Sequence, residues 1–368
     1  MLRRFLALTL PVLLALGAPG PVAAQQPPVL NVYNWSDYID PYAVARFQQE
    51  TGIRIRYDVF DSLETLEGKL SAGRSGYDII VPTSEPTFAR LVRAGALLPL
   101  DRDRIPNWGN QDPLLLRQVE ASDPGNRHGA IYLYGTVGLG IRLDRVRELL
   151  PGAPLDSLDL LMKPENAQRL ARCGIAVMDS ATDVFPSVLR WLGRDPNATD
   201  AASQRAAEEA LLAIRPYVRA ITASGNIMDA LATGEYCVAL TYSGDVIQAR
   251  ARAQAAGRGV EIGYVQPREG AQLWFDMLAI PADAPNPAAA HAFIDFLLRP
   301  AVMAGITNQV RYPNAVPAAT ALVDPAVRQD PNVYPTTEML QRTFIATTLA
   351  PAVERGRSRS WNRIKAGR

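Results

Sequence analysis

Short strand patterns alternate with helix patterns at the start of this chain, and this alternation limits the folds open to it. Three segments have the composition of strands: residues 30–35 (LNVYNW), 53–59 (IRIRYDV) and 78–82 (DIIVP). Asp40, followed by Pro41, begins a helical segment that ends at Gly52. A second helical segment begins at Asp61 and ends at Gly73. The pattern predicts a doubly wound α/β lobe, in which ligands bind outside the carboxyl ends of the strands.

The second half of the chain also contains strand and helix patterns. Further strand patterns cover residues 174–179, 236–242, 263–265 and 277–281, and a helix pattern covers residues 289–298. Without the leader described next, about 344 of the 368 residues remain, which suits two domains of ~150 residues each. The chain has no low-complexity linker, so we expect two closely apposed lobes with a cleft between them.

Residues 1–24 have the pattern of a secretory signal peptide. Arg3 and Arg4 precede an apolar run that reaches Leu16, and small residues lead to Ala24, which predicts cleavage before Gln25. The alternative is a membrane anchor, but the run is short for a span of ~20 residues and is followed by glycines and prolines. No cysteine stands near the cleavage point to accept a lipid. We therefore expect a soluble periplasmic protein.

The charge balance narrows the range of partners. The chain has 38 basic and 37 acidic residues, and loss of Arg3 and Arg4 with the leader leaves 36 against 37, a formal charge of −1. A near-neutral chain gives no reason to expect nucleic acid or an anionic membrane surface as a partner. Any selectivity for cations must come from local carboxylates.

Cys173 and Cys237 are the two cysteines of the chain. In an oxidising compartment an isolated pair usually forms a disulfide, and the alternatives are a metal ligand or a nucleophile. Neither His128 nor His291 has metal-ligand spacing to a cysteine. We therefore favour a disulfide and expect no metal and no cofactor.

Three predicted strand-end loops place an aromatic side chain close to an aspartate. These are residues 35–38 (WSDY), 242–245 (YSGD) and 274–276 (WFD), and Tyr312 adds a further aromatic. Taken singly, such an aromatic is more often rim packing, and such an aspartate is more often a helix N-cap. Together they predict a cleft for an elongated cation, because aromatic faces cover a methylene chain while carboxylates pair with ammonium groups.

Longer stretches of the chain resemble one family, the periplasmic polyamine-binding proteins of ABC transporters, and most of all its putrescine-binding branch. The likeness covers nearly the whole mature chain and is most specific in residues 30–37 (LNVYNWSD), 57–82 (YDVFDSLETLEGKLSAGRSGYDIIVP), 163–166 (KPEN), 243–246 (SGDV), 275–276 (FD) and 297–300 (LLRP). It implies a type II periplasmic binding protein fold, with lobes at residues 25–135 plus 256–311 and 136–255 plus 312–368. It also implies a non-enzymatic monomer that delivers a small polyamine to a membrane permease, and it matches the two cysteines to a disulfide.

The resemblance implies an aromatic box around the aliphatic chain of the ligand. Trp35 and Tyr38 would contribute to this box, and Tyr312 would close it. Two members depart from the family pattern, because Tyr242 stands where we expect Trp and Trp274 where we expect Phe.

Polar residues would hold the two ends of the ligand. The resemblance implies that Asp37 and Asp245 serve one end, that Asp276 is the principal salt-bridge partner at the other end, and that Ser36 bonds an ammonium directly. The full predicted set of ligand-binding residues is Trp35, Ser36, Asp37, Tyr38, Thr83, Glu85, Asp183, Tyr242, Asp245, Trp274, Asp276 and Tyr312.

Further departures bear on selectivity. Asp183 stands where the putrescine branch has Glu, which is one methylene longer, and Thr83 replaces a Ser. Glu85 is a carboxylate where the family has Ser or an aromatic. If Glu85 faces the cleft, it could take a third ammonium or the guanidinium of agmatine, and if it faces solvent it has no role.

Ligand length follows from the cost of burying charge. Spermidine adds three methylenes, worth roughly 2.4 kcal/mol if buried, but it also adds an ammonium whose burial without a partner costs more. We therefore predict putrescine or a similar short diamine, with spermidine or agmatine as the alternative. Anion and sugar binders share the fold class, but an anion binder should show Arg or backbone nests in these loops, whereas these loops carry Asp. An enzyme is disfavoured, because neither G-x-S-x-G nor H-E-x-x-H occurs.

Overall fold

The computed structural model describes residues 28–71 and 73–367, so the predicted signal peptide lies outside the described residues. The strands are β1 Val29–Trp35, β2 Arg54–Phe60, β3 Ile79–Ile80, β4 Gly129–Arg142, β5 Ile175–Met178, β6 Ala220–Thr222, β7 Val238–Tyr242, β8 Ile262–Val265, β9 Ala271–Ala279 and β10 Thr343–Phe344. The α-helices are α1 Pro41–Thr51, α2 Leu63–Ser71, α3 Ala89–Arg93, α4 Pro113–Gln118, α5 Leu143–Leu149, α6 Asp159–Met162, α7 Pro164–Leu170, α8 Ala181–Trp191, α9 Ala201–Ile214, α10 Ser224–Thr233, α11 Ser243–Ala255, α12 Pro287–Leu297, α13 Pro300–Val310, α14 Pro317–Thr320, α15 Pro325–Arg328, α16 Thr337–Gln341 and α17 Pro351–Ala366.

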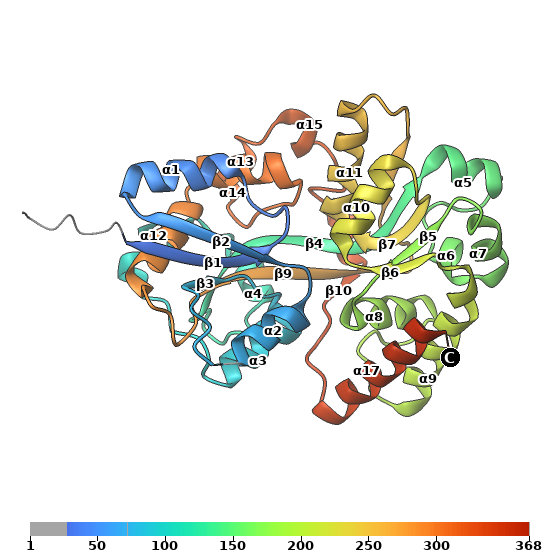
Figure 1. Ribbon diagram of the computed structural model, residues 1–368, viewed down its shortest axis with the longest axis horizontal. Helices are drawn as coiled ribbons and strands as arrows, with labels where there is room; N and C mark the ends of the chain where they lie inside the picture. The colour runs from blue at the N-terminus through green and yellow to red at the C-terminus, as the bar shows by residue number, and fades with distance from the viewer. Residues whose placement is uncertain (1–27, 72, 368) are drawn as a thin grey trace, which may run out of the picture.

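The strands form a sheet in the order β2-β1-β3-β9-β4-β7-β5-β6. At one end β1 pairs in parallel with β2 and β3, and at the other end β5 pairs in parallel with β6 and β7. Between them β4 and β9 run antiparallel to each other and connect the two ends. Figure 1 shows helices on both faces of each end, so the molecule consists of two α/β lobes joined by β4 and β9.

The strands expected in residues 30–35, 53–59, 174–179 and 236–242 are present to within two residues. The strand expected in residues 277–281 instead begins at Ala271. Trp274 and Asp276 therefore lie inside a strand, and the prediction that they lie in a loop is wrong. Every residue of β9 is buried, because both faces of this connecting strand are covered, so the polar-apolar alternation that marks a half-exposed strand is absent.

Strand β4 has no counterpart among the predicted strands. Its sequence, GAIYLYGTVGLGIR, is rich in glycine, which is unfavourable inside a strand. The structure gives a physical reason for Gly138, because a Cβ atom there would lie 2.5 Å from the Tyr264 hydroxyl and from the Val265 carbonyl oxygen. The glycine lets β8 and its tyrosine pack directly against β4.

Local signals position the loop that follows β1. The Asp40 side chain accepts a hydrogen bond from the Tyr42 backbone N–H at 2.9 Å and caps α1, as predicted. Gly52 ends the helix in the left-handed conformation, with φ of 70°. Because β1 and α1 are both fixed, residues 36–40 are held at the carboxyl edge of the sheet.

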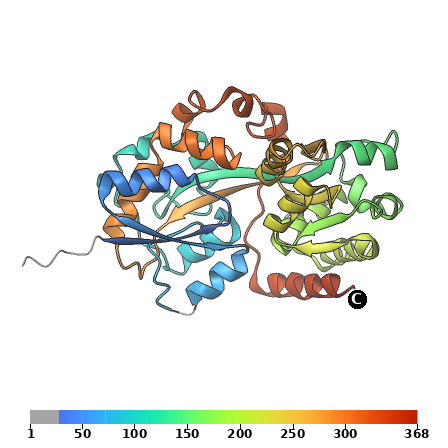
Figure 2. The same cartoon turned by 45° about the horizontal axis from the view of Figure 1, so that its top comes forward.

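The predicted lobe boundaries remain a prediction, and two pairings bear on them. β8 pairs with residues 139–142 of β4, and residues 137–141 of β4 pair with β7 along the other edge, which groups β8 with the second lobe. The chain then returns through β9. After β10 pairs with β9, α17 packs on α8 and α9, and Figure 2 shows it as a red helix beneath the second lobe. The segment that carries α17 is thus a third connection between the lobes.

The two cysteines are joined. Cys173 and Cys237 form a disulfide with their Cα atoms 5.5 Å apart, which confirms the predicted pair. The bond links the turn after α7 to the residue before β7. It therefore stabilises the second lobe internally and does not restrain movement of one lobe against the other.

Candidate ligand-binding site

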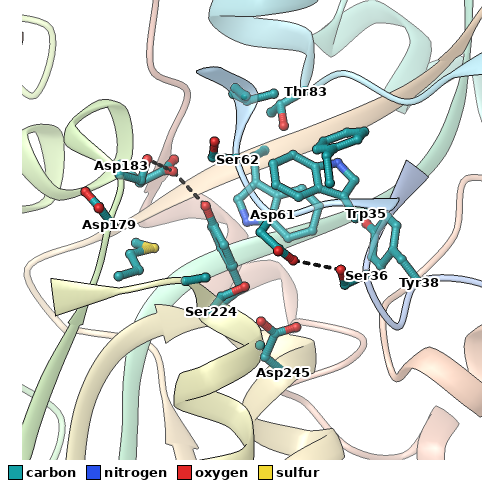
Figure 3. A pocket seen from close by; sticks show the side chains of 18 of the residues that line it. Trp35, Ser36, Tyr38, Asp61, Ser62, Thr83, Asp179, Asp183, Ser224 and Asp245 are labelled. Carbon is teal, nitrogen blue, oxygen red and sulfur yellow. Dashed lines mark hydrogen bonds between the residues drawn. The ribbon is translucent and has the colours of Figure 1, made fainter. Parts of the chain in front are cut away.

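A cavity of about 930 Å³, part of it open to solvent, lies between the two lobes. Its walls come mainly from the segments that follow β1, β2, β3, β5, β6 and β7, which are the carboxyl ends of the parallel strands. It brings together the predicted residues Trp35, Ser36, Tyr38, Thr83, Glu85, Asp183, Tyr242, Asp245, Trp274, Asp276 and Tyr312. Figure 3 shows Trp35, Ser36 and Tyr38 on one side, with Asp179 and Asp183 on the opposite side.

Asp276 is the most deeply buried acid of this cavity, with 3% of its surface exposed. It projects from β9, and the Thr83 hydroxyl donates to its Oδ1 at 2.7 Å. Burial raises the pKa of Asp276 to about 7, although the Thr83 hydroxyl favours the charged form. The Tyr38 hydroxyl also lies close enough to favour the charged form, but it is not at hydrogen-bond geometry and has no other partner among the described residues. The carboxylate and this hydroxyl thus have unused acceptor positions beside the cavity.

Asp245 lies in the first turn of α11, directly after β7. The Tyr312 hydroxyl donates to Asp245 Oδ1 at 2.7 Å and accepts from the Asp245 backbone N–H at 3.2 Å. Burial raises the pKa of Asp245, while the hydroxyls of Tyr312 and Ser224 favour its charged form. Gly244 makes the contact with Tyr312 achievable, because a Cβ atom there would lie 2.4 Å from the tyrosine ring.

Asp183 is also buried, but other side chains of the protein occupy both of its oxygens. Ser180 Oγ and Tyr242 Oη donate to Oδ2 at 2.5 and 2.8 Å, and Gln272 Nε2 donates to Oδ1 at 2.6 Å. Burial raises the pKa of Asp183, and these three donors oppose that effect. The carboxyl fixes the Tyr242 hydroxyl, so the shorter acid and the tyrosine, both departures from the family pattern, interact with each other.

The predicted aromatic residues form a continuous cluster. Tyr38 packs edge-on against Tyr312 at 5.3 Å between ring centroids, Tyr312 packs against Trp274 at 5.2 Å, and Trp274 packs against Tyr242 at 5.7 Å. Trp35 is anchored separately, because its indole N–H donates to the Val81 carbonyl at 3.0 Å. These contacts hold the rings as rigid walls of the cavity.

Glu85 lines the cavity, and both of its carboxylate oxygens have partners. Ser122 Oγ donates to Oε1 at 2.9 Å, and Thr348 Oγ1 donates to Oε2. Thr348 belongs to the segment between β10 and α17. Glu85 therefore links the first lobe to the connecting segment, and a cation would have to displace these hydroxyls to reach its oxygens.

Asp37 is the one predicted residue that does not line the cavity. Its side chain is 55% exposed, and its Oδ1 lies 3.4 Å from Nη2 of Arg252 on α11. Arg252 also pairs with Asp229 at 2.8 Å. Asp37 thus forms an ion pair across the mouth of the cleft, and its role at one end of the ligand stays a prediction.

Sequence reasoning missed part of the cavity wall. The unpredicted lining residues are Phe60, Asp61, Ser62, Leu63, Glu64, Met178, Asp179, Ser180, Thr182, Ala223, Ser224, Gly225 and Met228. They lie at or after the carboxyl ends of β2, β5 and β6. The strands β2 and β5 were predicted, so the residues that follow them could have been included because ligands bind at the carboxyl ends of parallel strands. The strand β6 was not predicted. Several of them contact predicted residues: Ser36 Oγ donates to Asp61 Oδ1 at 2.7 Å, and Ser180 Oγ donates to Asp183 Oδ2 at 2.5 Å.

A metal site and a membrane-spanning helix are two other features that residues 28–71 and 73–367 could contain. No group of three or more His, Cys, Asp or Glu side chains there could hold a metal ion. No single helix in this range is long and apolar enough to cross a membrane, although the bent pair α12 and α13 passes that test by length and composition.

Two α/β lobes with an acidic and aromatic cavity between them define a solute-binding protein. The chain belongs to the family of bacterial extracellular solute-binding proteins, whose model matches residues 42–336. This membership confirms the predicted fold class and the non-enzymatic role.

Its relatives place the chain within that family. It is 45% identical, over 100% of both chains, to a putrescine-binding periplasmic protein of Pseudomonas aeruginosa. It is 44% identical to a putrescine-binding periplasmic protein of Escherichia coli, over 95% of this chain and 94% of the relative. A solved structure described as a putative spermidine/putrescine ABC transporter from Listeria monocytogenes has a TM-score of 0.82 and 30% identity, covering 92% of this chain and 99% of that one. The predicted resemblance to polyamine-binding proteins is confirmed.

Proposed function

We propose that this protein is the periplasmic substrate-binding component of a polyamine ABC importer and that it binds putrescine or a similar short diamine between its lobes. The names of its relatives support the class of ligand. The number of cavity carboxylates that keep an oxygen free of protein donors supports a short ligand with two ammonium groups.

Protein donors already occupy both oxygens of three of the seven acids that line the cavity. The carboxylates that line it are Asp61, Glu64, Glu85, Asp179, Asp183, Asp245 and Asp276. The two that follow β2 are exposed, and protein donors occupy both oxygens of Glu85, Asp179 and Asp183. Asp245 and Asp276 remain as buried or half-buried acids with an oxygen that no described donor bonds at hydrogen-bond geometry. Two such acids suit a ligand with two ammonium groups.

The energetics require both charged ends. Burying four methylenes of a diamine yields roughly 3 kcal/mol, which alone corresponds to affinity weaker than millimolar. Each ammonium has three donors, and the unused oxygen of Asp276 and the unpartnered Tyr38 hydroxyl can accept two of them. Because both acceptors are buried, hydrogen bonds to them offset much of the hydration free energy that the ammonium loses on leaving water.

Capture would proceed by lobe closure. Ion pairs already cross between the lobes on two sides of the cavity: Asp37 with Arg252 at 3.4 Å, and Arg90 on α3 with Glu354 on α17. A ligand that bridges both lobes stabilises the closed arrangement, which a membrane permease can then recognise.

Calorimetry of the purified mature chain tests this proposal. We expect saturable, one-site binding of putrescine, and much weaker binding of spermidine and of an acidic amino acid. Agmatine serves as the probe for a guanidinium end. Asp276→Asn should weaken putrescine binding by more than about 2 kcal/mol, whereas Asp229→Asn, at an exposed partner of Arg252, should leave it unchanged. Absence of putrescine binding, or tight binding of the acidic amino acid, would refute the proposal.

A further inference from the structure

Asp179 is an acid of the cavity that the C-terminal helix neutralises. The Trp361 indole N–H donates to Asp179 Oδ1 at 2.7 Å, and Lys365 Nζ lies 3.1 Å from Asp179 Oδ2. Both partners belong to α17, which is remote in sequence from the strand ends that build the cavity. Figure 3 shows Asp179 beside Asp183 on the second-lobe side.

The position of Lys365 is fixed by its helix. Trp361 is buried and packs against Phe185 of α8, with ring centroids 6.4 Å apart. The Arg215 guanidinium donates to the backbone carbonyls of Ile364 and Lys365, each at 3.1 Å. The last turn of α17 is therefore tied to the second lobe, and the Lys365 ammonium is delivered to the cavity wall by a fixed backbone.

We propose that Lys365 is a specificity-determining residue that withholds Asp179 from the ligand and so disfavours polyamines with a third ammonium. The inference rests on the proposed diamine function. A diamine uses the two acids that keep a free oxygen, Asp245 and Asp276, and does not need Asp179. A triamine carries one more charge into the same cavity, where the Lys365 ammonium already pairs with Asp179.

Removing the lysine should change selectivity and leave diamine binding in place. Without Lys365, Asp179 keeps its Trp361 donor but has an unpaired oxygen and an uncompensated charge at the cavity wall. The side chains of Lys365 and Asp179 are 38% and 37% exposed, so solvent screens their interaction and the gain is moderate. We expect Lys365→Gln to raise the affinity for spermidine about three- to tenfold, with putrescine affinity within about twofold of wild type.

Arg363→Gln is the matched control for charge and helix stability. Arg363 lies on the same helix and pairs with Glu208 at 2.6 Å, and Glu208 does not line the cavity. The substitution changes the net charge by the same amount as Lys365→Gln. A second variant, Asp179→Asn combined with Lys365→Gln, removes the acid whose release the proposal invokes.

The experiment is calorimetric titration of wild type and the three variants with putrescine and spermidine, together with thermal unfolding of each. The proposal is supported if the ratio of spermidine to putrescine affinity rises only in Lys365→Gln and returns to the wild-type ratio in the double variant. It is overturned if the ratio does not move, or if it rises equally in Arg363→Gln or in the double variant. Wild type that binds no diamine would instead refute the proposed function, so the two failures are distinguishable.

Discussion

Replacing Asp276 by Asn is the perturbation that tests the site most directly, because it should stabilise the ligand-free protein while it destroys the binding function. Asn has nearly the same shape and keeps an acceptor for the Thr83 hydroxyl, which donates to Asp276 Oδ1 at 2.7 Å. The substitution therefore removes the buried charge with little change in packing.

The expected gain in stability of Asp276→Asn follows from the pKa of Asp276 in the folded protein. Burial raises the pKa of Asp276 from 3.8 to about 7, which corresponds to about 4 kcal/mol of stability lost when the carboxyl is ionised in the folded protein. The folded pKa lies above the unfolded value, so this loss is absent below about pH 4, grows with pH, and is complete above about pH 7. Asp276→Asn should therefore be more stable than wild type by up to about 4 kcal/mol near pH 8, and by only about 1 kcal/mol near pH 4.5.

Denaturant unfolding of the ligand-free proteins at these two pH values, followed by tryptophan fluorescence, measures the difference. Asp229→Asn is the control, because Asp229 is exposed and its substitution should change stability by less than about 0.5 kcal/mol. In parallel, Asp276→Asn should weaken putrescine binding by more than about 2 kcal/mol, since a buried ammonium loses its partner. A variant that is no more stable than wild type near pH 8, or whose gain does not depend on pH, would contradict the burial argument.

Putrescine affinity should fall about tenfold for each pH unit below about 7, because the cation must displace the proton of Asp276. Calorimetry in buffers of different ionisation enthalpy should detect the proton release. An affinity that does not change with pH would contradict the role of Asp276. Gly244→Ala should lower putrescine affinity at least about tenfold with unchanged circular dichroism, because its Cβ would lie 2.4 Å from the Tyr312 ring. Gly109→Ala is the control, because Gly109 does not line the cavity and a Cβ there meets nothing within 4 Å, so this variant should bind normally. Replacing both cysteines by serine should lower the free energy of unfolding by about 2–4 kcal/mol, because the disulfide joins residues separated by 64 positions. Putrescine affinity should persist. Loss of binding would show that the disulfide shapes the site.

Strand patterns predicted much of the fold because they are local. The residues of β1 and β2 and the cap at Asp40 carry their own signals, and each element formed where it was expected. The connecting strands β4 and β9 were missed in whole or in part, because burial on both faces removes the alternation and β4 is rich in glycine. Glycine in a strand has a physical reason only when the partner that approaches it is known, as Gly138 shows with β8.

The sequence by itself determined the chemistry of the site: aromatic rings and aspartates that follow strands, which suit an elongated cation. Only the tertiary structure decided which carboxylates keep an oxygen for it. Asp183 is held by Tyr242, Glu85 by Thr348 and Asp179 by Lys365, and each partner lies more than fifty residues away in the chain. The residue type identifies a carboxylate in the sequence. Whether that carboxylate is free to bind the ligand depends on neighbours that only folding brings within hydrogen-bond distance.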